Sequence, residues 1–418
     1  MAATRQLRLL LSAYACEPDT GSEPGVGWHW MLALLRRGHH VCVITRANNR
    51  PGIERACTAL NLPLGEELEF IYYDLPAWAS WWKKGGRGVH LYYALWQHGV
   101  LRLAREAHRR HRFDAVHHLT FGVWREPSLL YRLGLPFVYG PVGGGDSAPP
   151  LLRNTLPFKP RAVEWLREWI NTLSLLNPVL RACLQQASLV VSKTPETAAW
   201  VRRGGARGDT VSLEIGIDSA KLSPRSATRM DGEPLRCLYA GRLIGLKGVH
   251  LAIDALAEAR RLGGEVVLTI VGDGPMRANL ESRVAGHKLQ PYVQFIPWLS
   301  QVDLFQQYRE HDALLFPSLR DSSGNVVLEA MAHGLPVVCL KLGGPGVLVD
   351  DSCGYAVVPH ATSADATSRL LGSTLRHLQG DTALWRQLRE GALARAAATS
   401  WESAAANIYE RFPARARA

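Results

Sequence analysis

The sequence has no hydrophobic run long enough to cross a membrane. Across its 418 residues, no stretch approaches the roughly 20 consecutive apolar residues that a bilayer requires. The first strand-like run, Leu9-Leu-Leu-Ser, is short and leads into the acidic turn Cys16-Glu-Pro-Asp, which is not the pattern of a signal peptide. We therefore expect a cytoplasmic protein.

Cysteine is scarce and irregularly spaced. The seven cysteines are odd in number and show no Cys-x-x-Cys spacing: Cys16, Cys42, Cys57, Cys183, Cys237, Cys339 and Cys353. This pattern argues against a zinc site and against a disulfide framework, and it favours a reducing compartment.

Several signatures of cofactor and nucleic-acid binding are also missing. The sequence has no Walker pattern, and its first glycine-rich turn lacks the Gly-x-Gly-x-x-Gly spacing followed by an acid about 20 residues later. No Asp-x-Asp pair stands where it could hold a metal, so we expect neither a metal nor another cofactor. No nucleic-acid recognition motif is present, so we expect no nucleic-acid partner.

Acidic residues are fewer than basic ones, 37 against 48, which gives a net charge of +11. Basic residues cluster in the first half of the chain: Lys83, Lys84, Arg87, Arg102, Arg105, Arg109, Arg110 and Arg112. Aromatic residues are interleaved with them: Trp78, Trp81, Trp82, Tyr92, Tyr93 and Trp96. This combination suits an anionic membrane surface, so we expect peripheral binding to the inner face of the plasma membrane. The alternative is a solvated helix whose aromatic rings face the core.

Short apolar segments alternate with helical stretches along the whole chain. The predicted strands of the first half are 7–13, 41–45, 70–73, 115–118, 137–140 and 189–192, and those of the second half are 236–240, 266–271, 293–296, 313–316, 337–340 and 355–358. This alternation predicts an α/β protein with two doubly wound parallel sheets, in which ligands bind at the carboxyl ends of the strands.

The polar segment 221–234 has no clear periodicity and is predicted to be the interdomain linker. We expect an N-terminal domain over residues 1–215 and a C-terminal domain over residues 216–395. A final helical segment is expected over residues 396–418. The chain length suits two domains of about 200 residues each.

The most informative motif is Asp321-Ser-Ser-Gly-Asn-Val-Val-Leu-Glu329, which follows the apolar strand Ala313-Leu-Leu-Phe-Pro317. It predicts a strand, a polar loop and a helix N-terminus, where free amide groups favour a phosphate or sugar phosphate. We expect the amides of Gly324, Asn325 and Val326 to touch the ligand. The two acids suit the separate hydroxyl groups of a nucleotide sugar. The alternative is an ordinary capped helix start.

Two other strand-to-helix turns carry groups suited to phosphate. Arg242 and Lys247 follow the strand ending at Ala240 and suit a diphosphate leaving group. Gly272 and Gly274 form another turn after a strand. In the first half, the turn containing Gly21 and Gly25 leaves room for backbone close to a ligand phosphate, although simple tight-turn geometry is an alternative.

Together these motifs resemble those of the retaining glycosyltransferases of family 4, which have the two-domain GT-B fold. That family carries Gly-Arg-x4-Lys-Gly, a Gly-Asp-Gly-Pro turn, and an acid followed eight residues later by Glu. The segments Ser12-Ala-Tyr-Ala-Cys-Glu-Pro and Gly21-Ser-Glu-Pro-Gly-Val-Gly-Trp28 look like a bacterial branch associated with surface-polysaccharide assembly. The resemblance covers nearly the whole chain and is strongest over residues 236–358. One departure is Asp321, where many relatives have Glu.

The resemblance implies two Rossmann-like domains facing a cleft and a final helix that crosses back to the N-terminal domain. It implies retaining transfer of a hexose from a UDP- or GDP-linked sugar to a glycan or lipid-linked acceptor. The implied catalytic residues are His118, Asp321, Arg242 and Lys247. Glu329 would bind the ribose, and Gly272 and Gly274 would line the donor site.

Other assignments stay open at this point. His117 is a second histidine in the same strand and is more simply interpreted as a core residue, and residues 141–147 are candidates for lining an acceptor cleft. The acceptor could be a small soluble molecule. The chain could also be a non-catalytic nucleotide-sugar binding protein, or a GT-B phosphorylase or epimerase. The joint presence of Arg242, Lys247 and Glu329 argues against loss of catalysis.

Overall fold

The computed structural model describes residues 6–83, 85, 87–218, 229–361 and 363–412. The chain divides into two compact units, each of which is described by itself. Unit 1 consists of Met1–Gly145, Ile170–Glu214 and Trp401–Ala418, and unit 2 consists of Asp146–Trp169 and Ile215–Ser400.

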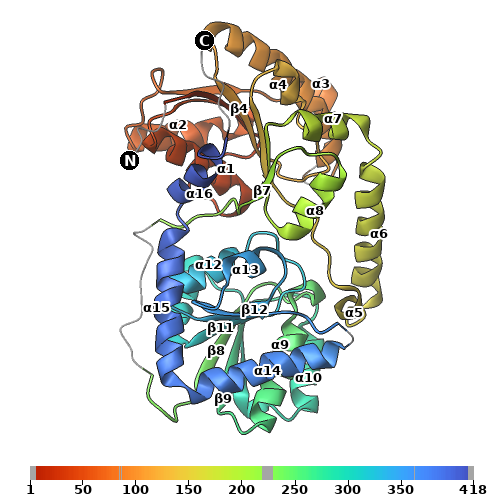
Figure 1. Ribbon diagram of the computed structural model, residues 1–418, viewed down its shortest axis with the longest axis vertical. Helices are drawn as coiled ribbons and strands as arrows, with labels where there is room; N and C mark the ends of the chain where they lie inside the picture. The colour runs from red at the N-terminus through yellow and green to blue at the C-terminus, as the bar shows by residue number, and fades with distance from the viewer. Residues whose placement is uncertain (1–5, 84, 86, 219–228, 362, 413–418) are drawn as a thin grey trace. The chain divides into compact units, whose positions relative to one another are not determined.

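Unit 1 is built on a seven-stranded parallel sheet with the strand order β3-β2-β1-β4-β5-β6-β7 (Figure 1). Its strands are β1 (Arg8–Ala13), β2 (His40–Thr45), β3 (Leu68–Tyr72), β4 (Ala115–Thr120), β5 (Phe137–Val142), β6 (Leu189–Ser192) and β7 (Asp209–Val211). Its helices are α1 (Ser22–Arg36), η1 (Ala47–Asn49), α2 (Arg50–Ala59), α3 (Ala77–Ser80), α4 (Val89–His111), η2 (Leu129–Leu133), α7 (Pro178–Gln186), α8 (Pro195–Arg203) and α16 (Trp401–Tyr409).

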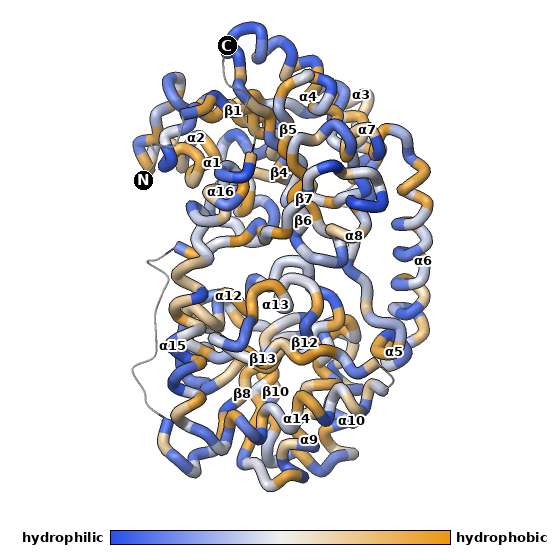
Figure 2. Tube along the Cα trace, viewed as in Figure 1, coloured by the Kyte–Doolittle hydropathy of each residue, from blue (hydrophilic) through white to orange (hydrophobic). Residues whose placement is uncertain are grey.

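Both faces of the unit 1 sheet are covered, which explains why its strands are apolar along their whole length. Side chains alternate between the two faces of a strand, so Leu9 and Leu11 of β1 lie in one hydrophobic cluster and Leu10 in the other. Trp30 of α1 belongs to the first cluster and Trp96 of α4 to the second. The orange stretches along the strands in Figure 2 follow this buried pattern.

The last helix, α16, packs on unit 1. The Trp401 ring stacks on His29 of α1 with a centroid distance of 4.7 Å. The hydroxyl group of Tyr409 lies 3.0 Å from Nδ1 of His117, whose Nε2 lies 2.6 Å from the carbonyl oxygen of Gly140. Because the carbonyl group can only accept, Nε2 carries the proton and Nδ1 accepts from the tyrosine. His117 therefore has a structural role in joining α16 to the sheet.

Unit 2 is built on a six-stranded parallel sheet with the order β10-β9-β8-β11-β12-β13. Its strands are β8 (Leu235–Ala240), β9 (Val266–Val271), β10 (Val293–Ile296), β11 (Ala313–Phe316), β12 (Val337–Leu340) and β13 (Gly354–Val357). Its helices are α5 (Pro150–Arg153), η4 (Gly245–Lys247), α9 (Val249–Arg261), α10 (Arg277–Gly286), η5 (Gln290–Tyr292), α11 (Gln301–Glu310), α12 (Asn325–Ala332), α13 (Gly343–Leu348), α14 (Ala364–Gly380) and α15 (Thr382–Ala398). Helix α6 (Phe158–Ser174) begins in unit 2 and ends in unit 1.

The strand order reverses direction once in each sheet, between β1 and β4 in unit 1 and between β8 and β11 in unit 2. At such a point the connections that follow two neighbouring parallel strands run to opposite sides of the sheet. This opens a crevice at the carboxyl ends of the strands, where doubly wound sheets bind their ligands. The prediction of two doubly wound parallel sheets is confirmed.

The boundaries of the units differ in part from the predicted domains. The segment Asp146–Trp169, predicted to lie in the first domain, clusters with unit 2. Of the predicted linker 221–234, residues 221–228 lie outside the described residues. Its described part is fixed, since the buried guanidinium group of Arg229 donates to the carbonyl oxygens of Glu233 and Gln379. The short strand β7 was not predicted.

Only some of the aromatic side chains that were predicted for a basic surface over residues 78–112 are exposed. Trp78 and Trp81 are exposed, but three of the predicted rings are buried in the core of unit 1: Tyr92, Tyr93 and Trp96. Helix α4 has an apolar side, and its rings fill that side rather than the basic one. The Lys83 ammonium group lies 4.5 Å from the Tyr92 ring, and Lys84 lies outside the described residues. This part of the prediction was wrong for those three rings.

In the described parts of the chain, no helix is long and apolar enough to span a bilayer. All seven cysteines are buried and unpaired. Burial raises the pKa of the Cys183 thiol to about 12. That thiol therefore stays protonated at neutral pH.

Candidate functional site

The turn after β8 carries the two predicted diphosphate ligands. Arg242 is exposed, and its guanidinium group makes no hydrogen bond or ion pair within the described chain. Gly248 follows η4 with a φ of +70°, and a Cβ atom there would lie 1.8 Å from the carbonyl oxygen of Pro317. Only glycine fits that position. The turn after β8 is therefore pressed against the end of β11, which brings Lys247 close to the Asp321 loop.

The Asp321 carboxylate organises the loop after β11. Its Oδ1 atom accepts hydrogen bonds from the amide groups of Ser323 at 3.1 Å and Gly324 at 2.9 Å. An aspartate side chain is short enough to fold back onto amides two and three residues later. This geometry suits Asp at position 321, because the longer side chain of Glu would overshoot these amides.

Lys247 and Asp321 form an ion pair in this structure, with Nζ 2.5 Å from Oδ2. Both side chains are less than one-fifth exposed. Burial by itself would raise the pKa of the Asp321 carboxyl group, but the charge of Lys247 and the hydrogen bonds from Lys247, Gly324 and Ser323 outweigh it and lower that pKa. The carboxylate is therefore ionised at neutral pH, and the ammonium group stands at the carboxyl end of the sheet.

Glu329 lies on α12, one side of which faces α11. Its carboxylate accepts hydrogen bonds from Gln301 at 3.1 Å and from the Tyr308 hydroxyl group at 3.2 Å. Burial raises the pKa of Tyr308 well above its ordinary value, so that hydroxyl group remains a donor. Glu329 is half-buried. Its carboxylate is held in one orientation at the edge of the predicted site.

The N-terminus of α12 presents amide groups beside Asp321. The amide of Gly324 donates to the Asp321 carboxylate, and its contact with a ligand stays a prediction. Asn325 is exposed and Val326 is half-buried, and they begin the first helical turn, whose amides have no partner inside the helix. Those two positions keep their predicted role as amide donors.

The glycine turn after β9 is close to the turn after β8. Gly272 has a φ of +139°, and a Cβ atom there would lie 2.0 Å from the carbonyl oxygen of Gly241. Gly274 donates its amide to the Asp273 carboxylate at 2.7 Å, and the space for its side chain is closed by Leu243. The structure thus shows that these glycines allow close contact between loops, while their predicted contact with the donor stays a prediction.

Sequence reasoning missed two pairs of side chains at this site, although Asp146 lies within the candidate acceptor segment 141–147. Ser322 donates to the buried Asp146 carboxylate at 2.5 Å, and Arg320 forms an ion pair with Glu164, which is fully buried. In each pair one residue is next to Asp321 in the sequence, and its partner comes from the segment Asp146–Trp169. We call this segment the clasp. No local motif marks it, because its partners lie more than 150 residues away.

The clasp also contacts the turn after β8. The Thr155 hydroxyl group lies 2.8 Å from Nε2 of His250, and a Cβ atom on Gly245 would lie 2.8 Å from the side chain of Leu156. The Glu164 carboxylate accepts the amide of Ala148 at 3.1 Å, which fixes the clasp internally. The two loops that carry Lys247 and Asp321 are therefore both held by one segment.

The other predicted residues lie at the carboxyl ends of β1 and β4, in unit 1. Gly25 is buried in α1, and a Cβ atom there would lie 2.1 Å from the carbonyl oxygen of Thr20. Gly21 is exposed and has open space beside it. The geometry gives Gly25 a packing role and leaves Gly21 accessible.

His118 is fully buried in β4. Its Nε2 lies 3.3 Å from the Tyr93 hydroxyl group, and the backbone of Phe121 also interacts with the ring. Burial, with a smaller effect of the neighbouring His117, lowers the pKa of His118 to about 3, so the ring is neutral at pH 7. This is the environment of a core histidine, and a role in sugar transfer stays a prediction.

Residues 141–147, the candidate acceptor segment, are held by hydrogen bonds. The amide of Gly143 donates to Gly122, and the amide of Gly145 donates to the Thr197 hydroxyl group. Most of the segment is buried. Positions 144 and 147 are half-buried, and contact of the segment with an acceptor stays a prediction. Elsewhere in the described parts of the chain, no three His, Cys, Asp or Glu side chains group closely enough to hold a metal ion.

The match to a known protein family lies within unit 2. Residues 234–373 match the family described as "Glycosyl transferases group 1". This range contains all six strands of unit 2 and every donor residue predicted there. A curated relative, D-inositol 3-phosphate glycosyltransferase from Streptomyces bingchenggensis, is 30% identical over 236 residues, which are 52% of this chain and 50% of that protein. The chain thus spans about half the length of that relative. These findings support the group 1 glycosyltransferase family for unit 2.

Solved structures are similar over nearly the whole chain. Sucrose-phosphate synthase from Thermosynechococcus elongatus aligns with a TM-score of 0.61 and 19% identity, over 97% of this chain and 98% of that one. HepE from Anabaena in complex with UDP and glucose aligns with a TM-score of 0.56 and 18% identity, over 97% and 99%. At this identity the likeness shows the fold alone, which is GT-B.

Proposed function

We propose that this GT-B protein is a retaining glycosyltransferase of family 4. It would move a hexose from a UDP- or GDP-linked donor to a glycan or lipid-linked acceptor in the synthesis of a bacterial surface polysaccharide. The observation that carries the proposal is the arrangement at the strand-order reversal of unit 2. There Lys247, Asp321 and the N-terminus of α12 meet, and Glu329 is held one helical turn further on.

The donor is proposed from this geometry. Lys247 and the exposed Arg242 supply positive charge for a diphosphate, and the amides of Asn325 and Val326 add the partial charge of a helix N-terminus. Glu329, held by Gln301 and Tyr308, can accept both hydroxyl groups of a ribose. The name of HepE, solved with UDP and glucose, supports UDP-glucose as the first donor to test.

The proposed sugar transfer develops negative charge on the leaving diphosphate, and this decides which side chains assist it. The bond between the anomeric carbon and the diphosphate oxygen breaks, and the acceptor oxygen attacks the same face. The acceptor's proton passes to the leaving phosphate, so no strongly basic side chain is needed. Preorganised positive charge at the leaving group lowers the barrier of such a step. Arg242 and Lys247 take this role in place of a metal, and Asp321 orients the sugar hydroxyl groups.

His118 takes part in this proposal as a neutral residue. Its low pKa excludes a cationic role at neutral pH. Its neutral ring can take part in a hydrogen bond with a sugar hydroxyl group, which is the role that the family resemblance implies for it. A membrane-bound acceptor is proposed from the basic and aromatic surfaces of the chain, together with the name of the lipopolysaccharide enzyme WaaG among proteins of similar fold.

A donor panel tests the proposed activity. Release of nucleoside diphosphate is measured for UDP- and GDP-linked hexoses, with and without a lipid-linked or a soluble glycan acceptor. We expect one donor to give release that increases strongly when an acceptor is added. Release that needs only a small soluble acceptor would favour the alternative in which the acceptor is a small soluble molecule. Tight binding of a donor with no turnover under any condition would contradict the proposal and favour a binding protein.

A further inference from the structure

Helix α6 has its polar side turned inward. Three polar residues at positions 164, 168 and 171 share one side of the helix by the period of 3.6 residues. Glu164 pairs with Arg320, Glu168 pairs with the buried Arg153, and Asn171 accepts a hydrogen bond from Arg125 at 2.5 Å. These are contacts that normally face water. On this helix they lie on the inward side, where Glu164 and Asn171 are fully buried and Glu168 is half-buried.

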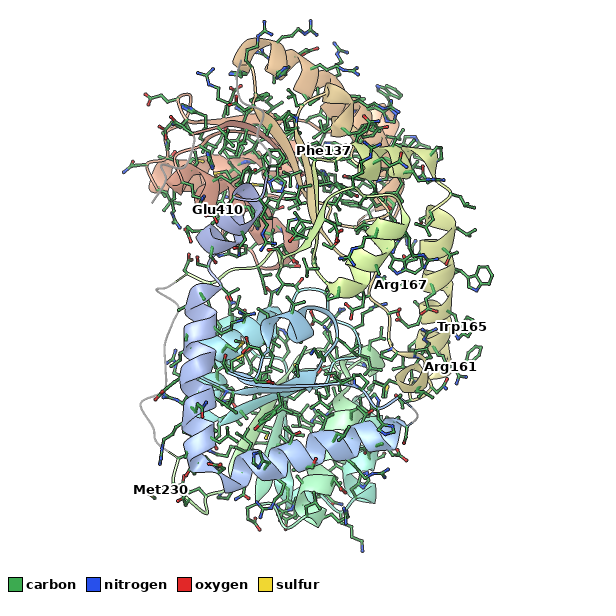
Figure 3. All side chains as sticks on the ribbon, in the orientation of Figure 1. Phe137, Arg161, Trp165, Arg167, Met230 and Glu410 are labelled. Carbon is green, nitrogen blue, oxygen red and sulfur yellow. The ribbon has the colours of Figure 1, made fainter. Side chains whose placement is uncertain are left out.

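The opposite side of α6 is apolar and exposed. Eight large apolar residues on α6 and just after it are between 44% and 75% exposed: Phe158, Val163, Trp165, Leu166, Trp169, Ile170, Leu173 and Leu176. A surface helix of a soluble protein ordinarily has the reverse polarity. Figure 3 labels Trp165 on this helix, and Figure 2 shows apolar and polar stretches alternating along it. A continuous apolar face of this kind marks an interaction site.

The charges around this face are of one sign. Both acids of α6 are paired with arginines on the inward side, so neither contributes a free negative charge to the outer one. Lys159 is exposed beside the apolar residues, and Arg161 lies with its guanidinium group 5.9 Å from the Phe158 ring. Exposed tryptophan and leucine bordered by lysine and arginine suit the boundary between lipid headgroups and acyl chains.

We propose that the outer face of α6 docks the protein on an anionic lipid membrane. The helix would lie in the plane of the interface, with its tryptophan and leucine side chains among the acyl chains and its cations at the headgroups. This proposal rests on the membrane-bound acceptor of the proposed function and places the docking surface on α6, whereas the sequence placed it on residues 78–112. The same helix holds the Asp321 loop through Glu164, so docking would fix the membrane against an element of the donor site.

Vesicle sedimentation of the full chain tests the proposal. Large vesicles of phosphatidylcholine, with and without phosphatidylglycerol, are mixed with the protein in the absence of donor and acceptor. We expect the wild type to bind the mixed vesicles, and the variant Trp165→Gln/Trp169→Gln/Leu173→Gln to bind at least about tenfold more weakly, because the side chains that enter the membrane are lost. Lys159→Gln/Arg161→Gln should weaken binding only to the mixed vesicles, and that difference should vanish at high salt.

A matched control is Leu60→Gln/Met230→Gln, which replaces residues 55% and 64% exposed on other elements and should bind like the wild type. All replaced apolar residues are exposed, so thermal unfolding should be unchanged. Three results would overturn the proposal. They are wild-type binding by the triple variant, loss of binding only with Lys83→Gln/Arg87→Gln, and a wild-type dimer that the triple variant converts to a monomer. The last would make the face a contact between two copies. Because no turnover is measured, failure of the proposed activity would leave this result intact.

Discussion

At the scale of single residues, the site depends on a short carboxylate. Asp321 is bound on one oxygen by two amides of its own loop and on the other by Lys247. A donor sugar must therefore bind beside an intact ion pair or displace one of its partners. Arg242, by contrast, is exposed and has no partner among the described residues. The two residues predicted to bind the diphosphate thus differ before a donor binds, since Lys247 is paired with Asp321 and Arg242 is not paired within the described chain.

Replacing these two cations should separate catalysis from stability. We expect Arg242→Ala and Lys247→Ala each to lower kcat by about two orders of magnitude, because each removes charge from the leaving group. Only Lys247→Ala should also destabilise the fold, by about 1–3 kcal/mol, because it leaves Asp321 partly buried without its partner. Steady-state kinetics and thermal unfolding of both variants provide the measurement. Near-normal rates in both would show that neither binds the diphosphate.

The two acids should respond differently to loss of charge. Glu329→Gln should mainly raise the donor KM, because ribose contacts are the same in the ground and transition states. Asp321→Asn keeps an oxygen for the two amides but loses the charge beside the sugar, so kcat should fall as well. Initial rates over a range of donor concentrations distinguish the two. If both variants change KM alone, Asp321 has only the structural role of organising its loop.

At the scale of elements, the proposed donor site depends on a segment far away in the sequence. The clasp holds the turn after β8 through Thr155 and Leu156, and the loop after β11 through Asp146 and Glu164. Glu164 is buried, and a buried carboxylate is stable only with a partner. The main contribution of Arg320 to stability is therefore to neutralise the charge of the Glu164 carboxylate.

A double-mutant cycle tests the clasp. Arg320→Ala should destabilise the protein by about 3–5 kcal/mol, since it leaves Glu164 charged and unpaired in the interior. Glu164→Gln should cost less, and the double variant Arg320→Ala/Glu164→Gln should recover much of the loss. Both single variants should raise the donor KM, because Asp321 is adjacent to Arg320. Chemical denaturation and donor kinetics are measured together. Additive stability losses, with no recovery, would mean that the pair is not coupled.

At the scale of the whole molecule, six histidines among the described residues are buried, and burial lowers the pKa of each. The pKa falls to about 4 for His39, His117 and His250 and to about 3 for His118, and it is lowered for His311 and His333 as well. In the unfolded chain each would titrate near 6.5. The unfolded state therefore binds more protons than the folded state at any pH between these values. Stability is then gained as pH rises and lost as it falls.

We expect the thermal unfolding midpoint to fall steadily as the pH is lowered from 7 to 4. Asp321, whose pKa is lowered in the folded state, adds a loss of the same sign further into acid. Replacing His117 with Asn, which can still hydrogen-bond to Tyr409, should flatten this dependence while costing some stability at pH 7. Scanning calorimetry over this pH range is the check. A midpoint that is flat between pH 7 and 5 would mean that these rings are protonated without penalty.

Much of the fold could be predicted from local patterns. All twelve predicted strands lie within one residue of the observed ends on at least one side, because apolar runs between glycine turns are local signals. The edge strand β7 was missed, since its three residues are only half-buried and carry no such run. The candidate donor residues of unit 2 were proposed from the same local signals. They lie in the turns and helix starts that follow β8, β9 and β11, and parallel strands end at one edge of a sheet.

What the sequence determined by itself was every strand of the described chain except β7, the two-sheet architecture and the segments after the strands that carry Arg242, Lys247, Asp321 and Glu329. What only the tertiary structure decided was how those groups are held. The pairing of Lys247 with Asp321 and the clasp from Asp146 to Trp169 both join residues more than 70 positions apart. The tertiary structure also decided which aromatic rings are buried and that α6 turns its apolar side outward. Composition does not show these outcomes, because the side of a helix that is buried depends on the partner packed against it.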